Sequence, residues 1–216
     1  MRMPTNEDMR PLHRRAVEAS VDVVSSVTVN DLGRPTPCAG WSLADLLAHM
    51  TVQHNGFAAS ARGNGADLEI WRPARVTDAV IADPVGTYTA AATDLLDAFA
   101  ADGVLEATFA LPEFGPDATV PGAMAIGFHF VDYVVHGWDV ARSIDVPFAL
   151  PADVVRAVLP VALGVPDGDF RADDGSPFGR ALTPTDGASD LDRILRHLGR
   201  SPAWTPESAR KPAASA

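Results

Sequence analysis

Three side chains of one predicted helix have types and a spacing that could bind a metal ion. His129, Asp132 and His136 all fall in the most apolar segment of the chain. Because Asp132 and His136 are four residues apart, a helix places them one turn from each other on one face. A carboxylate within so apolar a helix is costly unless it has a partner. The spacing therefore indicates two metal ligands supplied by one helix.

A third ligand is available at His49, on another predicted helix. This histidine lies within one turn of Leu46 and Met50, which belong to an apolar stripe, so it falls on or beside the inward face. Helical bundles build metal sites from side chains on facing helices that point into the core. Two imidazoles and one carboxylate suit zinc, with nickel or manganese as alternatives, and leave positions open for water or substrate.

Simpler interpretations of the same residues stay open. A histidine on an apolar helix face is more often a hydrogen-bonded core residue than a ligand, and an Asp–His pair at this spacing is often only a hydrogen-bonded pair. His129, seven residues before His136, is a candidate spare ligand, partner of a ligand, or catalytic acid/base. His54 is expected to face solvent or the mouth of the site. Cys38 is a weaker candidate nucleophile, and no partner is evident for His13.

Periodic apolar residues predict the helices that position these groups. A first helix is expected from about Asn6 to Val29. Ser42, with Asp45 three residues on, resembles a capping box and marks the start of a second helix. A third helix opens at residue 84 and stops at 103, after a polar loop over 62–77; a fourth runs from 121 to about 144. Trp41 and Trp138 are interpreted as packing residues.

The fold class that follows is all-α. We expect a four-helix metal-binding bundle over residues 1–146 and a helical extension packed on it over 147–204, with helices at 151–164 and 189–198. Residues 107–111 and 118–120 form at most a small β-hairpin. Residues 205–216 are rich in Pro, Ala and Ser and are expected to be a disordered tail.

The composition narrows the classes of partner. The chain has 216 residues, with 17 Lys+Arg against 28 Asp+Glu and a net charge of -11. That balance repels a phosphate backbone, so no nucleic-acid partner is expected. A single cysteine favours a reducing compartment, and no stretch approaches the roughly 20 apolar residues of a membrane helix. We expect a cytoplasmic protein that acts on a small-molecule substrate without a membrane, and a homodimer because such bundles often pair.

Two motifs and the C-terminal sequence resemble the DinB-like superfamily, in the branch related to mycothiol-dependent maleylpyruvate isomerase. Residues 36–42 (TPCAGWS) followed by 46–50 (LLAHM) resemble the opening of the family. Residues 132–141 (DYVVHGWDVA) resemble its second ligand helix. Residues 192–202 resemble the C-terminus of its small actinobacterial members. The resemblance spans roughly residues 12 to 204.

The resemblance implies a divalent metal held by His49, Asp132 and His136. It also implies activation of a thiol cosubstrate such as mycothiol, for transfer to an electrophile or for cis–trans isomerisation; a metal lowers the pKa of a bound thiol. Two departures stand out. Asp132 occupies a position where the isomerase has Glu, and only residues 151–204 stand in place of the larger C-terminal domain of that enzyme.

The expected function is therefore a metal-dependent thiol transferase or isomerase, with His129 and Asp132 as catalytic residues. One alternative is a metal-independent tailoring enzyme that uses the same cavity, with His129, Asp132 and His136 as acid/base groups. The other is a protein that binds a metal or a small ligand without turnover.

Overall fold

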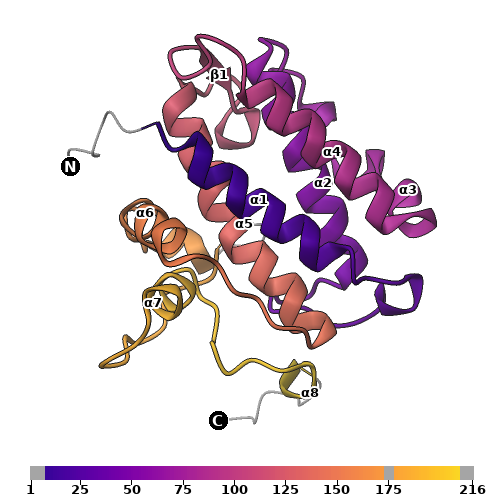
Figure 1. Ribbon diagram of the computed structural model, residues 1–216, viewed down its shortest axis with the longest axis vertical. Coiled ribbons are helices and arrows are strands. Elements are labelled where there is room, and N and C mark those ends of the chain that lie inside the picture. The colour runs from indigo at the N-terminus through magenta and orange to yellow at the C-terminus, as the bar shows by residue number, and fades with distance from the viewer. Residues whose placement is uncertain (1–7, 173–177, 210–216) are drawn as a thin grey trace.

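Four long helices form a bundle in the computed structural model, which describes residues 8–172 and 178–209 (Figure 1). They are α1 (Arg10–Val24), α2 (Leu43–Ala61), α4 (Pro84–Phe99) and α5 (Gly122–Ile144). α2 packs along α4 and α1 along α5, and contacts of α1 with α4 and of α2 with α5 close the ring. The predicted all-α class is confirmed.

Local capping explains where two of these helices begin. The N–H of Asp45 donates to the hydroxyl of Ser42, and the Asp45 carboxylate accepts from the backbone N–H of Ser42 at 2.9 Å. This is the predicted capping box of α2. At α4 the carboxylate of Asp83 accepts from the N–H of Gly86 at 2.9 Å, and Pro84 takes the first helical position, which needs no hydrogen-bond donor.

α1 is shorter than its apolar pattern suggested and ends at Val24. The hydroxyl of Ser25 donates to the carbonyl of Asp22 at 2.6 Å. Thr28 and Asp31 then cap a separate 3-10 turn, Val29–Asp31, through hydrogen bonds to each other. Serine and threonine side chains compete with the helix in this way for backbone partners, and so favour its end.

The predicted polar loop over 62–77 is more structured than expected. It contains 3-10 turns at Leu68–Trp71 and Pro73–Arg75, and leads into the short α3 (Thr77–Ala82), which the sequence analysis missed. Trp71 is buried, and its indole N–H donates to the carbonyl of Gly65 at 2.9 Å. Its ring lies where a Cβ on Gly56 would stand, so the loop packs closely on α2.

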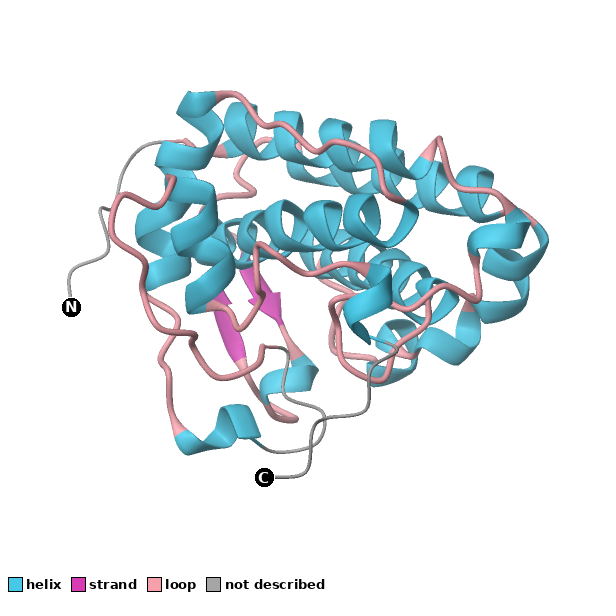
Figure 2. Ribbon diagram, turned by 90° about the horizontal axis from the view of Figure 1, so that it is seen from below, coloured by secondary structure: helices cyan, strands magenta, loops and turns pink. Residues whose placement is uncertain are grey.

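The predicted hairpin is present and short. β1 (Thr108–Ala110) pairs antiparallel with β2 (Thr119–Pro121), and Phe109 lies opposite Val120 (Figure 2). Between the strands a 3-10 turn, Pro112–Phe114, carries an acidic and an aromatic side chain.

The C-terminal segment packs on the outer face of the bundle. α6 (Ala152–Leu163) contacts α5, α1 and α7 (Asp190–His197), and a 3-10 turn at Asp169–Ala172 precedes α7. α8 (Pro206–Ala209) lies at the start of the predicted tail, and residues 210–216 of that tail lie outside the described part of the chain.

α5 is the longest of the described helices, and two cores share it. One face joins the bundle core through Ile126, Tyr133 and Val140. An adjoining face, with Phe130 and Val134, joins a second cluster formed with α6 and α7. A helix covered on both sides must be apolar nearly all round, which is why this segment stands out in the sequence.

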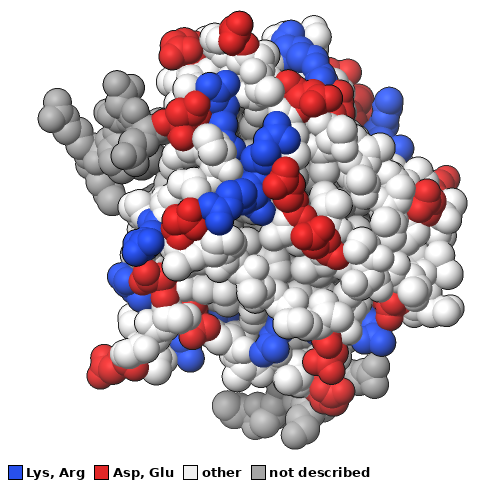
Figure 3. Space-filling view, viewed as in Figure 1, with Lys and Arg blue, Asp and Glu red and all other residues white. Residues whose placement is uncertain are grey.

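The surface over α1 is mixed in charge. Basic and acidic side chains alternate there in the space-filling view (Figure 3), with Arg14 3.9 Å from Glu18 and Arg15 2.5 Å from Asp153. None of the described helices combines the length and the apolar character that crossing a bilayer requires.

Candidate metal centre

The three predicted metal ligands lie together in the seam between α2 and α5. Asp132 Oδ1 is 3.5 Å from His136 Nε2, and Asp132 Oδ2 is 4.0 Å from His49 Nε2. One ligand atom from each residue lies within 4.8 Å of the other two. Ligands around a tetrahedral zinc ion, each at roughly 2.0–2.1 Å from it, stand about 3.3 Å apart. The donor set and its spacing therefore fit a divalent ion after small side-chain movements.

The packing of two antiparallel helices brings the triad together. His49 lies opposite His136 in the seam, and His54, further along α2, lies opposite His129, nearer the start of α5. The side chains of His49 and Asp132 are 20% and 18% exposed, whereas that of His136 is 3% exposed. The triad is therefore reached from solvent on the side of His49 and Asp132.

A buried carboxylate forms a hydrogen bond with the ring nitrogen of His136 that faces away from the triad. The Nδ1 atom lies 2.9 Å from Oδ2 of Asp139, which is fully buried three residues further along α5. A carboxylate that accepts a hydrogen bond from one ring nitrogen leaves the other for a metal, and this arrangement recurs in metal sites. No role was predicted for Asp139 from the sequence, although its helical spacing from His136 was a usable signal.

Asp139 is paired in turn with an arginine from the C-terminal segment. Nη2 of Arg200 donates to Asp139 Oδ2 at 3.3 Å and to Cys38 Sγ at 3.3 Å. Its Nη1 donates to the carbonyl of Leu198 at 2.8 Å. Arg200 follows Gly199, whose φ of 80° is typical of a helix C-terminus. No local sequence signal connects Arg200 to α5, so only the fold reveals this pair.

A compact loop before α2 places Cys38 and Trp41 at the two sides of the centre. The hydroxyl of Thr36 donates to the carbonyls of Cys38 at 3.1 Å and of Trp41 at 3.0 Å. The backbone N–H of Trp41 donates to the carbonyl of Cys38 at 3.0 Å. The thiol of Cys38 therefore lies on the Nδ1 side of His136, and the indole ring of Trp41 lies 5.0 Å from the ring of His49.

Cys38, His136 and Asp139 form a second group of potential ligands. Cys38 Sγ is 3.3 Å from Asp139 Oδ2 and 3.9 Å from His136 Nδ1. The guanidinium of Arg200 already lies against both the thiol and the carboxylate. A metal ion at this point would face a like charge at close range, so the contacts favour the triad with His49 and Asp132.

Burial and neighbouring charges set the protonation of the triad and of Asp139. Burial lowers the pKa of His49 to about 3, so its imidazole is neutral near pH 7. Burial opposes protonation of His136, but the charge of Asp132 and the hydrogen bond to Asp139 raise its pKa to about 10. Burial raises the pKa of Asp132, although the nearby His136 acts to lower it. Burial also acts to raise the pKa of Asp139, but Arg200 and His136 hold it below its usual value.

A further carboxyl group lies on the hairpin side of the triad. Gln53, one helical turn beyond His49, donates to Oε2 of Glu113 at 2.8 Å. Burial raises the pKa of Glu113, helped by the charge of Asp132 and opposed by the hydrogen bond from Gln53. Glu113 was not among the residues predicted from the sequence, because nothing local relates the hairpin turn to α2.

The structure does not bring His129 to the triad. Seven residues separate it from His136, which is two helical turns or roughly 10 Å along the axis. Its Nδ1 lies 2.8 Å from Nε2 of His13 in the core, and its ring stacks on Tyr133 at 4.0 Å. The partner of His13, which the sequence did not reveal, is therefore His129.

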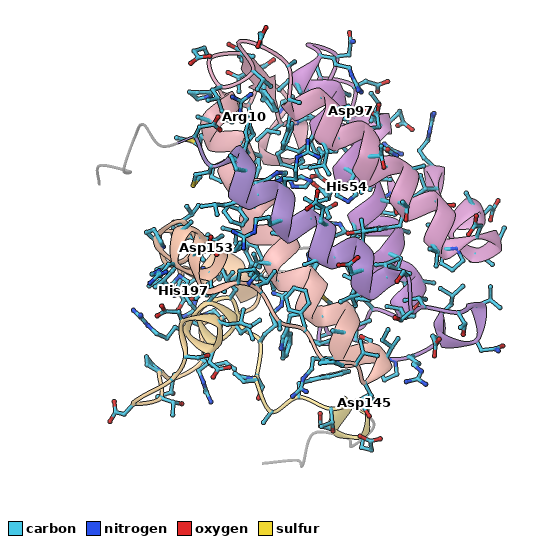
Figure 4. All side chains as sticks on the ribbon, in the orientation of Figure 1. Arg10, His54, Asp97, Asp145, Asp153 and His197 are labelled. Atoms are coloured by element: carbon cyan, nitrogen blue, oxygen red, sulfur yellow. The ribbon has the colours of Figure 1, made fainter. Side chains whose placement is uncertain are left out.

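The expectation that His54 faces solvent or the mouth of the site is wrong. Its side chain is fully buried inside the bundle, where it stacks on Tyr133 at 4.1 Å (Figure 4). Neither of its ring nitrogens has a hydrogen-bond partner in the described part of the chain. Burial lowers the pKa of His13 to about 3 and holds those of His54 and His129 well below the usual value, so all three are neutral.

Two surface hollows lie away from the triad. One, of about 400 Å³, lies between α1 and α4 and is lined in part by His13 and Phe99. Another, of about 300 Å³, lies along the same two helices and is lined in part by Glu18 and Thr93. No residue of the triad lines either hollow.

Comparisons with known proteins agree with the resemblance seen in the sequence. The family model described as "Mycothiol maleylpyruvate isomerase N-terminal domain" matches residues 13–141, which include the whole triad. An uncharacterized protein of Mycobacterium tuberculosis strain H37Rv is 31% identical over 195 residues, which cover 89% of this chain and 99% of the relative. Its counterpart in strain CDC 1551 / Oshkosh matches to the same extent.

Two solved structures share the fold. The crystal structure of the mycothiol-dependent maleylpyruvate isomerase gives a TM-score of 0.54 at 14% identity, covering 72% of this chain and 67% of that chain. A histidine-to-alanine mutant of that isomerase gives 0.53 at 13% identity.

Proposed function

Because the chain belongs to the mycothiol maleylpyruvate isomerase N-terminal domain family, we propose that it is a divalent-metal-dependent enzyme with a thiol of the mycothiol type as cosubstrate. The observation that carries this proposal is the convergence of His49, Asp132 and His136 on one partly exposed point. These three side chains would hold the ion. Zinc is the ion we favour, because two imidazoles and one carboxylate suit it. The reaction would be S-transfer or isomerisation of a small-molecule substrate.

The shorter arm of Asp132 is compatible with this role. Its two oxygens already lie 3.5 Å and 4.0 Å from the facing nitrogens of His136 and His49. Close approach of α2 and α5 therefore makes up for the methylene group that a glutamate would add. The hydroxyl of Tyr133 donates to the carbonyl of Met50 and ties the two helices together at this level.

Each residue of the centre has a distinct task in the proposed mechanism. A bound divalent ion lowers the pKa of a thiol in contact with it, so that thiolate is available near neutral pH. Asp139 orients His136 and keeps its Nδ1 hydrogen in place. Glu113, whose pKa is raised by burial, is a proton donor within reach of the seam. The hydrogen bond of His129 to His13 favours a packing role for His129 over an acid/base role.

Elemental analysis of the purified protein tests the ligand set. We expect about one equivalent of a divalent metal in the wild type and its loss in His49→Ala and His136→Ala. His197→Ala is the matched control, because the Nε2 of His197 lies 2.9 Å from the carbonyl of Val165, away from the triad. A folded wild type prepared without chelator and free of metal would refute the proposal, and so would full metal content in His49→Ala.

Metal-independent acid/base catalysis at the same seam is a second candidate function. The observation that favours it is a pair of carboxyl groups, Asp132 and Glu113, whose pKa values are both raised by burial. Such groups exchange protons closer to neutral pH than exposed carboxyls do. Activity that survives complete removal of metal by chelation would favour this candidate over the first.

A further inference from the structure

Exposed aromatic side chains border the candidate metal centre. Among the side chains that the structure describes, the exposed aromatic ones are Trp41, at 38%, and Phe114, at 67%. Trp138, the other tryptophan interpreted from the sequence as a packing residue, is 6% exposed and fits that interpretation, whereas Trp41 does not. Exposed apolar groups that gather at one site often mark a surface that binds a ligand.

The two exposed rings lie on opposite sides of the triad along the seam. Trp41 precedes α2, and its ring is 5.0 Å from His49. On the other side, Phe114 follows Glu113, which is bonded to Gln53 one turn beyond His49. Phe114 also packs on Phe128 at 5.9 Å between ring centres, and Phe128 lies one turn before Asp132 in α5. Phe128 lies eight residues before His136, which faces His49, so about two helical turns, roughly 12 Å, separate the two aromatic walls along the seam.

The charges around the seam are poorly suited to an anionic substrate. Within the described residues, Arg200 is the one arginine or lysine whose charge acts on both His49 and Asp132. Its side chain is 5% exposed and is occupied by Asp139 and Cys38. On the open side, the carboxylate of Asp132 would offset part of the charge of a divalent ion held by the triad, and Glu113 adds a second acidic group. A dicarboxylate would find no free guanidinium there to pair with.

We propose that the seam binds an uncharged electrophile with a flat, apolar body, such as an aryl-substituted α,β-unsaturated ketone, between Trp41 and the Phe114–Phe128 pair. The inference rests on the proposed thiol-dependent function and names the class of its second substrate. In the reaction, the thiol sulfur forms a bond to the β-carbon, the π-electron pair of the alkene moves toward the carbonyl, and the thiol proton ends on the α-carbon. Thiol and enone combine with no other reactant and no net oxidation.

Equilibrium binding to the metal-loaded protein, without thiol, tests this class. The probes are 4-phenyl-3-buten-2-one as the uncharged aryl enone and maleate as the dicarboxylate, each titrated by calorimetry. We expect the enone to bind at least about tenfold more tightly than maleate, and Trp41→Ser and Phe114→Ser each to weaken enone binding about tenfold. Leu163→Ser is the matched control, since Leu163 is 37% exposed at the end of α6, on the outer face of the bundle; it should bind the enone as the wild type does.

The same preparations are analysed for metal, which separates the two proposals. Enone binding that depends on Trp41 and Phe114 in a protein with no affinity for metal would support the substrate class while the metal-dependent function fails. Metal retained together with maleate binding as tight as enone binding would overturn the substrate class alone. Enone binding unaffected by both serine substitutions would also overturn it.

Discussion

Asp139→Asn tests how the metal centre is supported by the C-terminal segment. The Oδ2 atom of Asp139 lies 2.9 Å from His136 Nδ1 and 3.3 Å from Arg200 Nη2. Both members of the ion pair are buried, with side-chain exposures of 5% for Arg200 and 0% for Asp139. The substitution keeps the size of the side chain and removes its charge. It therefore leaves a buried guanidinium with no counter-charge.

Two magnitudes follow from this geometry. Removing one partner of a buried ion pair costs about 3–5 kcal/mol of unfolding free energy. We expect the lower end, about 3 kcal/mol, because Arg200 keeps its hydrogen bond to the carbonyl of Leu198. Loss of the carboxylate that orients a ligand histidine lowers metal affinity about 10- to 100-fold, which corresponds to about 1.4–2.8 kcal/mol.

The two effects are measured separately. Urea unfolding of the metal-free protein gives the stability change, and competition with a chromophoric chelator gives the metal affinity. The double variant Asp139→Asn/Arg200→Met removes the orphaned charge and should recover part of the lost stability, because an apolar side chain has no charge to leave unpaired. Asp153→Asn is the control, because Asp153 forms an exposed ion pair with Arg15 on the surface.

Specific results would refute this reasoning. If Asp139→Asn changes stability by less than about 0.5 kcal/mol, as an ordinary surface substitution does, the buried pair is not a stabilising contact. If metal affinity stays at the wild-type level while stability falls, Asp139 supports the fold but does not orient His136. If the double variant is no more stable than the single one, the loss does not come from an unpaired charge.

Three further predictions concern the core histidines and the thiol. His54→Phe should raise the unfolding free energy in urea by about 1 kcal/mol, because it removes two buried ring nitrogens that lack partners and keeps the stack on Tyr133; a loss of stability would count against this. His13, with a folded pKa of about 3, stays neutral in the folded protein, whereas in the unfolded chain it takes up a proton below about pH 6.5. Its contribution to stability is therefore fully present above pH 6.5. Below that pH the unfolding free energy falls toward pH 3 by about 1.4 kcal/mol per pH unit. In unfolding experiments at pH 4–6, His13→Phe should therefore show a shallower pH dependence than the wild type; an unchanged slope would mean that His13 is protonated in the fold. Cys38→Ser should retain the metal content of the wild type, whereas loss of the metal on elemental analysis would assign the ion to the group of Cys38 and Asp139.

Features that depend on neighbours along the chain could be predicted from the sequence. The capping box of Ser42 and Asp45 acts within one turn, so it marks the start of α2 without reference to the rest of the fold. The pairing of Asp132 with His136 follows from helical geometry in the same way. The four helices and the short hairpin could be predicted because their apolar periods and turn residues are local signals.

How the helices surround one another depends on contacts between residues far apart in the sequence. His54 is buried because α2 is covered by α4, α5 and β1, so side chains on most of its circumference face other elements, and a helical period cannot report this. His129 lies in the same stripe as His136 but two turns away, at a level of the bundle where His13 meets it. Whether a histidine of this stripe can bind metal or packs in the core depends on its position along the bundle axis. The spacing of histidines in the sequence does not show which residues of other helices lie at that position.

The contact between Asp139 and Arg200, which supports the metal centre, could not be predicted from the sequence. Arg200 meets Asp139 because α6 and α7 fold back on the outer face of α5, and no residue between the two positions encodes that return locally. A buried charge needs an opposite charge nearby in space, but it places no condition on how far away that charge is in the sequence. The ligands His49, Asp132 and His136 could thus be proposed from the sequence, while the contacts that orient them are a property of the folded chain.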